Sequence, residues 1–317
     1  MATRSGGSTA EGALIARGLR YVNAWRGRTV VIKYGGSILS AGSDDPRDGR
    51  VAGTVVEDLV LLAGAGVLPV LVHGGGPEIS RWLERLGRTP RFIDGLRVTD
   101  DDTMDIVEMV LCGRANTTLV GRIIAAGGSA VGLSGRDARL FEAAPLLDPP
   151  GLGRVGRIVT VHPEIVHTLS AAGHLPVVAS VGLDGAGGSL NLNADHAAAA
   201  LAAAVGASKL ILLTDVEGIL READGRRELI SVLTAAEART LEREGVIAGG
   251  MIPKVDAALA AIAGGVASAH IINGETPHAL LVELFTEEGC GTMLLPQRQS
   301  VGLTPPFAER TRGEDNP

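Results

Sequence analysis

Two stretches of the sequence decide the fold: TVVIKYGGS at residues 29–37 and LPVLVHGGGP at residues 68–77. Each is an apolar run that ends in glycines and is followed by a helix-like stretch, which predicts a strand, a glycine turn and a helix. Glycines there let backbone N–H groups approach an anion without interference from a Cβ atom, and the start of the next helix adds a favourable dipole. The first turn follows Lys33. Together the two turns predict a site that holds phosphates or carboxylates.

The alternation of strands and helices continues along the chain of 317 residues. We expect strands over 29–34, 69–73, 130–133, 153–161, 177–183, 209–214 and 270–273, helices over 11–25, 51–65, 77–86, 103–126, 193–205, 234–244, 254–263 and 278–285, a further helix from 163, and a hairpin with an Asp-Gly turn over 92–98. This rhythm predicts an α/β fold with a mainly parallel central sheet and helices on both faces. Ligands of such sheets bind at the carboxyl ends of the strands, where both glycine turns and Thr214-Asp215 fall.

The composition limits the class of protein. Hydrophobic residues make up 45% of the chain and aromatic residues only 3%, so the core must consist mainly of Ala, Val, Leu and Ile. A net charge of −7 gives no electrostatic footprint for nucleic acid, so an anionic ligand must be held by local positive groups. Cys112 and Cys290 make no disulfide framework and are expected to be small buried residues. No apolar run is long enough for a membrane span and residues 1–10 lack a signal-peptide pattern, so we expect a cytoplasmic protein.

Two lysines carry the clearest chemical pattern. Lys33 ends an apolar strand just before Gly35-Gly36, and Lys254 follows Gly249-Gly250 near the start of a helix. Two lysines that approach one phosphoryl group from different directions are typical of phosphoryl transfer. A lysine at a strand end can also simply extend into solvent. The sequence contains no Walker P-loop, no HExxH or other zinc-ligand spacing among His73, His174, His196 and His278, and no nucleophile elbow.

Three further segments are candidates for a ligand site. Arg97 follows the expected hairpin turn and suits a carboxylate clamp, although a surface ion pair is an equal alternative. Asn193 is a plausible N-cap of the following helix, which leaves Asn191 and Asp195 free to face a site. The turn over 214–220 can wrap an adenosine, but it is also an ordinary connection between a strand and the next element.

Five strings, in this order, resemble the signatures of the N-acetylglutamate kinases, a family within the amino acid kinase superfamily. They are VIKYGG at 31–36, HGGGP at 73–77, GLRVT at 95–99, NLNAD at 191–195 and GGMIPK at 249–254. The match runs from about residue 11 to residue 297, and the third and fourth strings narrow it to this family. The resemblance implies an open αβα sandwich and ATP-dependent phosphorylation of the γ-carboxylate of N-acetyl-L-glutamate in arginine biosynthesis.

The same resemblance implies a role for each candidate residue. Lys33 and Lys254 would stabilise the charge of the transferring phosphoryl group, and Asp195 would orient both lysines. The remaining residues implied at the site are Gly36 and Gly75 as backbone donors, Gly75, Gly76, Arg97 and Asn191 for the substrate, and Gly35, Gly36, Thr214, Asp215, Val216, Gly218, Ile219, Leu220 and Lys254 for ATP. Mg2+ would be held mainly by the nucleotide phosphates, with no direct protein ligand. A carboxylate nucleophile is already ionised at neutral pH, so this chemistry needs no general base.

The ends of the chain carry a further resemblance, to arginine-sensitive members of the family. Tyr21, His270, Glu283 and Gly289 match positions that bind arginine there. This implies inhibition by L-arginine and, through the N-terminal helix, a hexamer built from dimers, with a dimer as the alternative. A PII-type signalling protein is compatible with the resemblance, but no residue points to it. Thr117 stands where the family usually has a lysine, and Asn273-Gly274-Glu275 replaces a common acidic–glycine–basic run.

The resemblance also implies a division into lobes. We expect an N-terminal extension over 1–28, a substrate-binding and dimerising lobe over 29–184, an ATP-binding lobe over 185–300 that also holds the arginine site, and a loose tail over 301–317. Two other functions remain open: a kinase for a related acylated amino acid, such as an aminoadipate derivative, and a non-catalytic arginine sensor. The presence of Lys33, Lys254 and Asp195 favours the enzyme, because a sensor does not need them.

Overall fold

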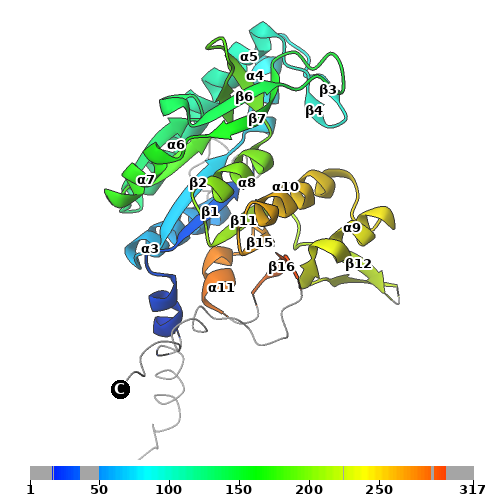
Figure 1. Cartoon of the computed structure of the whole chain (residues 1–317). Coiled ribbons are helices and arrows are strands. Elements are labelled where there is room, and N and C mark those ends of the chain that lie inside the picture. Colours follow the sequence, from blue (N-terminus) through cyan, green and yellow to red (C-terminus); the bar gives the residue numbers. More distant parts are fainter. Residues whose placement is uncertain (1–15, 17, 36–49, 224, 287–288, 298–317) are drawn as a thin grey trace, which may run out of the picture.

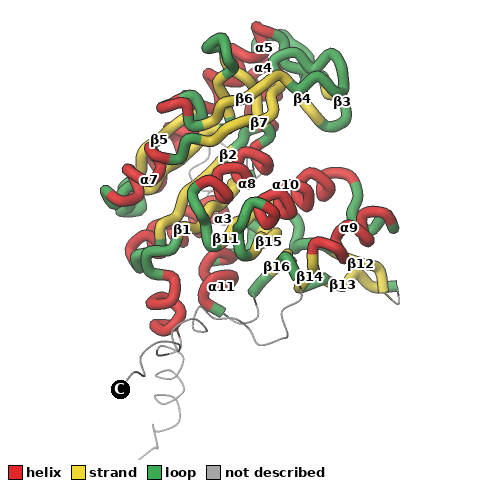
Figure 2. Tube along the Cα trace, in the orientation of Figure 1, coloured by secondary structure: helices red, strands yellow, loops and turns green. Residues whose placement is uncertain are grey.

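A mainly parallel sheet runs through the centre of the molecule (Figures 1 and 2). The computed structural model describes residues 16, 18–35, 50–223, 225–286 and 289–297. Eight strands make up the sheet, in the order β14 (Val232–Thr234), β16 (Gly291–Leu295), β15 (Ser268–Asn273), β11 (Lys209–Thr214), β1 (Thr29–Tyr34), β2 (Leu68–His73), β8 (Leu175–Ala179) and β5 (Ala130–Ser134). Every neighbouring pair is parallel except β15 and β16, which are antiparallel. The predicted α/β fold with a mainly parallel sheet is confirmed.

Helices cover both faces of this sheet. One face carries α3 (Arg50–Gly64), α6 (Asn116–Ala125) and α11 (Ala279–Phe285), and the other carries α7 (Glu164–Ala171), α8 (Ala194–Ala204) and α10 (Ile252–Ala263) (Figure 1). Alternate residues of a strand point to opposite faces. In β1, Ile32 therefore packs under the first set of helices, whereas Val31 packs under the second. Burial of both faces explains why the interiors of β1 (Val30, Val31 and Ile32) and β2 (residues 68–72) are apolar without alternation.

Small residues let α8 and α10 pack closely on the sheet and on each other, and Figure 1 shows these two helices side by side. The sequence of α8 is ADHAAAALAAA, and Ala197, Ala198 and Leu201 are fully buried. A Cβ atom at Gly264, just after α10, would lie 2.6 Å from the Cβ of Ala203. Close packing of these alanine-rich helices leaves little space for large side chains. This agrees with the low aromatic content of the chain.

A smaller assembly of strands adjoins the sheet where β8 ends. Its strands β6 (Phe141–Pro145), β7 (Val155–Val161), β9 (Val181–Leu183) and β10 (Ser189–Leu192) form a closed four-stranded barrel. The predicted hairpin is confirmed as β3 (Phe92–Ile93) and β4 (Leu96–Arg97), and Asp94 and Gly95 have φ angles of 48° and 78° in its turn. The helix expected over 103–126 runs as α5 (Asp101–Glu108), a π-helix (Met109–Ala115) and α6.

Several elements differ from the sequence prediction. The single strand expected over 177–183 is two strands in two sheets, because Ser180 separates β8 from β9. Strands β6, β10, β14 and β16 and the hairpin of β12 (Leu220–Ala223) and β13 (Arg226–Leu229) were not predicted. These strands are short, and β6 (FEAAP) and β12 (LREA) lack a run of β-branched residues, so the sequence pattern alone does not mark them. Cys112 and Cys290 are free, as expected, but half-buried and not buried.

The helix expected over 11–25 falls partly outside the described residues. Residues 1–10 and the tail expected over 301–317 lie wholly outside them. Residues 18–25 are helical. Trp25 closes this helix and donates a hydrogen bond from Nε1 to the carbonyl oxygen of Leu284 in α11, at 2.9 Å. The remaining helices of the described part are α4 (Gly76–Arg85), α9 (Ala235–Arg243) and two short 3-10 turns over Asp137–Arg139 and Gly249–Met251. Within the described residues, no helix combines the length and apolarity that a bilayer span requires.

Candidate active site

Two lysines from different elements share one buried carboxylate. Lys33 near the end of β1 places its Nζ 2.9 Å from Oδ1 of Asp195, and Lys254 in the first turn of α10 places its Nζ 3.1 Å from Oδ2. The side chains of Lys33 and Asp195 are each 9% exposed and that of Lys254 is 18% exposed. The structure thus brings together the three residues that the sequence predicted as a group.

Local structure explains why these groups meet. Asn193 caps α8 as predicted, because its Oδ1 accepts hydrogen bonds from the N–H groups of Asp195 and His196. Asp195 is therefore fixed in the first turn of α8, on the sheet face that Lys33 shares. A lysine in the first turn of a helix opposes the helix dipole. Lys254 is held there by its hydrogen bond to Asp195.

The charges at this group do not balance. Burial by itself would raise the pKa of Asp195, but the ammonium groups of Lys33 and Lys254 outweigh it and hold that pKa below the usual range. Burial lowers the pKa of Lys33, against the opposing attraction of Asp195. With both lysines protonated, the group of Lys33, Lys254 and Asp195 carries a net charge of +1 in a buried site. Such a site favours an anionic ligand.

A cavity of about 230 Å³ lies beside Lys33 and Asp195. Its lining residues are Lys33, Gly74, Gly75, Gly76, Ile79, Phe92, Gly95, Leu96, Arg97, Leu111, Val155, Ser180, Asn191, Leu192, Asn193, Ala194 and Asp195. Gly76 borders open space, whereas a Cβ atom at Gly75 would lie 2.7 Å from Cδ2 of Leu111 in the π-helix. The φ angle of Gly75 is −179°, so the close approach of Leu111, and not the backbone conformation, requires a glycine there.

Arg97 is buried at the edge of this cavity with one nitrogen free. Its Nη2 donates to the carbonyl oxygen of Gly76 at 2.7 Å and to Oγ of Ser80 at 2.9 Å, and its guanidinium lies 4.8 Å from the ring centre of Phe92. Its Nη1 is buried and has no hydrogen-bond partner among the described residues. A buried donor of this kind needs an acceptor, and a carboxylate would supply one.

Asn191 also lines this cavity. Its Nδ2 donates to Oγ1 of Thr99 at 3.2 Å, and Thr99 in turn donates to the carbonyl oxygen of Arg97. Asn191 and Arg97 are thus connected through Thr99. Ser180 and Leu111 also line the cavity. Neither was predicted from the sequence, because a lone serine or a leucine in a helical pattern carries no signal of a site.

The predicted nucleotide turn follows β11, next to β1. The carbonyl oxygen of Thr214 accepts a hydrogen bond from the N–H of Gly274 at 2.8 Å, and its Oγ1 donates to Oδ1 of Asp215 at 3.1 Å. Gly218 has a φ of 149° and packs so closely on Thr292 that a Cβ atom would lie 2.7 Å from Oγ1. That hydroxyl accepts a hydrogen bond from the N–H of Ile219. The segment continues through Leu220 into β12, and Val216 within it is 40% exposed.

The first glycine turn is described only in part. Gly35 is buried directly after β1. Gly36, predicted as a backbone donor, lies outside the described residues.

Three of the four predicted effector residues meet at the other end of the sheet. Nδ1 of His270 lies 2.5 Å from Oε1 of Glu283, and a Cβ atom at Gly289, where φ is 64°, would lie 2.8 Å from Oε2. Burial would raise the pKa of Glu283, but His270, the N–H of Cys290 and the charge of Lys209 together lower it to about 2. The fourth residue, Tyr21, lies one turn before Trp25 in the helix over 18–25.

Lys209 belongs to this effector cluster, although the sequence analysis missed it. Its Nζ lies 5.2 Å from the ring centre of Trp25. Burial lowers the pKa of Lys209, while Glu283 opposes that effect. Lys33, Lys209 and Lys254 are the only lysines of the chain, and all other basic side chains apart from histidine are arginines. The rarity of lysine in the sequence is therefore the signal that could have marked Lys209 as a candidate site residue.

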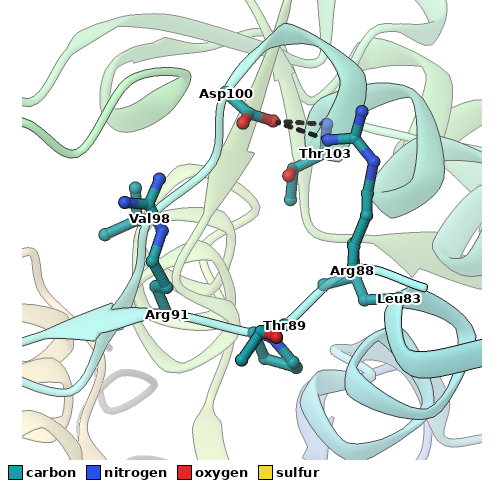
Figure 3. A pocket seen from close by; sticks show the side chains of 8 residues that line it. Leu83, Arg88, Thr89, Arg91, Val98, Asp100 and Thr103 are labelled. Atoms are coloured by element: carbon teal, nitrogen blue, oxygen red, sulfur yellow. Dashed lines mark hydrogen bonds and ion pairs between the residues drawn. The ribbon is translucent and has the colours of Figure 1, made fainter. Parts of the chain in front are cut away.

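A second hollow lies on the outer side of the β3–β4 hairpin, and Figure 3 shows its lining. Nη1 of Arg88 lies 3.6 Å from Oδ1 of Asp100, which also accepts a hydrogen bond from the N–H of Thr103 at 2.8 Å. Arg88 forms a further ion pair with Asp102. The charge of Arg88 is therefore already compensated. No residue that the sequence predicted at the site lines this hollow.

Comparison with known proteins gives relatives of matching length. An acetylglutamate kinase of Acaryochloris marina is 49% identical over 281 residues, which cover 89% of this chain and 96% of the relative. An acetylglutamate kinase of Pelotomaculum thermopropionicum is 49% identical over 292 residues, with 89% and 97% covered.

Solved structures agree with the fold. An N-acetylglutamate synthase from Neisseria gonorrhoeae, complexed with coenzyme A and N-acetyl-glutamate, has a TM-score of 0.78 at 27% identity; the match covers 91% of this chain but 64% of that longer one. A carbamate kinase from Giardia has a TM-score of 0.63 at 19% identity and shares the fold. The sequence model of the amino acid kinase family matches residues 28–273, and this chain therefore belongs to the amino acid kinase family.

Proposed function

We propose that this enzyme transfers the γ-phosphoryl group of ATP to the γ-carboxylate of N-acetyl-L-glutamate and forms N-acetyl-L-glutamyl 5-phosphate in arginine biosynthesis. The observation that carries the proposal is the buried group of Lys33, Asp195 and Lys254 beside a cavity that is also lined by Arg97, whose buried Nη1 has no hydrogen-bond partner among the described residues. The relatives named acetylglutamate kinase, 49% identical over most of the chain, support the choice of substrate.

The cavity suits an acidic, acylated amino acid. Nη1 of Arg97 is the donor that would hold the α-carboxylate, and Asn191 would hold the rest of the substrate with the Gly75 and Gly76 backbone. The γ-carboxylate would then face Lys33 and Asp195. A carboxylate is ionised at neutral pH, so it can attack without a general base, and positioning becomes the main task of the protein.

The unbalanced charge at the lysines fits ATP. Bound ATP, with Mg2+ on its phosphates, supplies the phosphoryl group. Lys33 and Lys254 would stabilise the negative charge on that group, and Asp195 would keep both ammonium groups in place. The turn from Thr214 to Leu220 would border the nucleotide, since it follows β11 at the same end of the sheet. The lobe over 29–184 would bind the amino acid, and the lobe over 185–300 would bind ATP.

L-Arginine inhibition is part of the proposal. The cluster of His270, Glu283 and Gly289 supports it, as does the likeness to an N-acetylglutamate synthase from Neisseria gonorrhoeae complexed with coenzyme A and L-arginine, with a TM-score of 0.75 at 27% identity. Glu283 is the anionic group that a guanidinium would approach. The helix over 18–25, fixed to α11 by Trp25, would couple this site to other subunits in a hexamer or dimer in the cytoplasm.

The test is ATP consumption with N-acetyl-L-glutamate, with and without L-arginine. We expect activity in the wild type and a loss of about 100-fold or more in kcat for Lys254→Met, which keeps the length of the side chain but not its charge. Arg239→Ala is the matched control, because Arg239 pairs with Asp256 of α10 at an exposed position. Turnover with an aminoadipate derivative instead would change the substrate, and arginine binding without any turnover would indicate a sensor.

Glu283→Gln tests the regulatory part separately. It keeps the shape of the side chain and removes its charge. We expect the variant to retain activity and to lose inhibition by arginine. Unchanged inhibition would refute the proposed effector site without affecting the proposed reaction.

A further inference from the structure

His73 is fully buried at the end of β2, directly before the second glycine turn. Strand alternation places its side chain on the face of the sheet that carries α6, opposite the face of Lys33 and Asp195. None of the roles proposed above uses this imidazole. Its contacts are nonetheless specific, and they lead to the backbone of the turn.

The hydrogen bonds of His73 fix its tautomer. Nδ1 lies 3.1 Å from the carbonyl oxygen of Gly74, which can only accept, so Nδ1 carries the proton and donates it. Nε2 then accepts a hydrogen bond from Nδ2 of Asn116 at 3.0 Å. Burial lowers the pKa of His73 to about 4, so the ring is neutral at pH 7 and keeps one proton.

Asn116 is itself held rigidly. The two hydrogens of its Nδ2 are shared among three acceptors: Nε2 of His73, the carbonyl oxygen of Val177 in β8 at 2.8 Å and that of Leu133 in β5 at 3.2 Å. A Cβ atom at Gly132 would lie 1.9 Å from Oδ1 of Asn116, so the sheet leaves room for this amide only because residue 132 is a glycine. Two strands and α6 thus anchor the group that orients the imidazole.

The carbonyl that His73 holds belongs to the peptide between Gly74 and Gly75. This peptide is trans, so its C=O and N–H groups point in opposite directions. The carbonyl lies on the side of His73, so the N–H of Gly75 lies on the other side of the peptide, and Gly75 lines the cavity that Lys33 and Asp195 also line. A peptide between two glycines can reverse at little steric cost, because neither residue has a Cβ atom to restrict it. Something must therefore hold its orientation.

We propose that His73, fixed by Asn116, is a positioning residue that holds the N–H of Gly75 toward the transferring phosphoryl group. This inference rests on the proposed function. His73 touches neither substrate nor nucleotide, and it acts through the Gly74 carbonyl. The imidazole acts through the hydrogen bond that its Nδ1 donates to the Gly74 carbonyl, and the hydrogen bond that its Nε2 accepts from Asn116 fixes the ring in place.

Two amide substitutions separate these hydrogen bonds. In His73→Asn the side-chain nitrogen can occupy the place of Nδ1 and donate to Gly74, whereas in His73→Gln the amide reaches the place of Nε2 and can bond only to Asn116. We expect kcat to fall about 100-fold in the Gln variant but less than about tenfold in the Asn variant, with the KM for N-acetyl-L-glutamate changed less than about threefold in both, because an oriented backbone donor is worth about 10²–10³ in kcat.

A binding measurement distinguishes positioning from general damage. ADP with fluoroaluminate, in the presence of N-acetyl-L-glutamate, mimics the transferring group, and calorimetry gives its affinity. The Gln variant should bind ADP alone like the wild type but bind the fluoroaluminate complex about 100-fold more weakly. His174→Asn and His174→Gln are the matched controls, since His174 precedes β8 at the opposite end of the parallel strands. Both controls should match the wild type.

The outcomes are distinct. Equal kcat values for the Asn and Gln variants of His73, or equal weakening of ADP and of its fluoroaluminate complex, overturn the positioning role. If His73→Gln does not fold, Asn116→Ala carries the test: it frees the tautomer of His73 and should lower kcat at constant KM, and a wild-type kcat overturns the inference. A wild-type enzyme that does not turn over N-acetyl-L-glutamate overturns the proposed function itself.

Discussion

Replacement of Asp195 by Asn removes the anion that two buried ammonium groups share. Two unit charges about 3 Å apart attract by about 5 kcal/mol at an effective dielectric constant of about 20, and loss of one partner of a buried ion pair costs about 3–5 kcal/mol. The side chains of Lys33 and Lys254 are only 9% and 18% exposed, so little water can replace the carboxylate. We expect the free energy of unfolding to fall by about 3–5 kcal/mol.

Urea unfolding at pH 7 measures this loss, and Asp256→Asn is its control. Asp256 pairs with Arg239 at 2.5 Å, but both side chains are about as accessible as an ordinary surface pair, so its loss should cost at most about 1 kcal/mol. Inorganic pyrophosphate should stabilise Asp195→Asn more than the wild type, because an added anion compensates the two ammonium groups and binds the folded state.

The result that refutes this reasoning is an Asp195→Asn variant as stable as the wild type and no more sensitive to pyrophosphate. Lys33 and Lys254 would then not both be charged in the folded state. A large loss of stability without any pyrophosphate effect would mean that the lysines are compensated by a group other than a bound anion. Either outcome would remove the electrostatic argument for phosphoryl transfer.

Three further predictions concern single residues. The pKa of Glu283 is about 2 in the folded protein against an ordinary 4.5, which contributes about 3 kcal/mol to the free energy of unfolding above pH 4.5. This contribution is lost as the pH falls toward 2. Acid unfolding, followed by circular dichroism, should therefore depend less on pH in Glu283→Gln than in the wild type. The pKa of His73 is about 4 in the folded protein against 6.5 in the unfolded chain. As the pH falls from 6.5 to 4, this difference should lower the free energy of unfolding of the wild type by about 3 kcal/mol. Thermal melts across that range should show no such contribution in His73→Asn. Gly75→Ala places a Cβ atom 2.7 Å from Leu111, which should lower kcat at least tenfold, and the added Leu111→Ala should restore part of it in steady-state assays.

The sequence predicted the parts of the site that depend on local patterns. Lys33 at a strand end before glycines, Asn193 as a helix cap and Lys254 at a helix start are all found as expected. Each is marked within about ten residues by a glycine turn, a cap or an apolar run. The parallel order of the strands then brings these ends together, because the carboxyl ends of parallel strands share one edge.

Other parts depend on contacts that no local pattern records. Strand β10 pairs with β7 and β9, which begin 34 and 8 residues before it, and its own four residues, SLNL, resemble a loop before a helix. Ser180 and Leu111 reach the cavity only because the strand breaks at the first and the helix widens to a π-helix at the second. Neither event is visible from composition or hydrophobic period.

The contact between His73 and Asn116 shows the same limit. The two residues are 43 positions apart, and the space for Asn116 depends on a third residue, Gly132. In the sequence, His73 is simply a polar residue after an apolar run. Its function becomes visible only when the direction of a single peptide group can be followed across the sheet.

Because the chain has only three lysines, reagents that modify amines can react at very few of its side chains. Amine-directed acylating reagents attack the uncharged amine of lysine but not the guanidinium of arginine, and the only amines of the chain are those of Lys33, Lys209, Lys254 and the amino terminus. All three lysines are at least half-buried, two beside Asp195 and one beside Glu283. The rate at which each becomes acylated, followed by peptide mass spectrometry, therefore reports how often its own site opens to solvent, in the unmodified protein and without an engineered label.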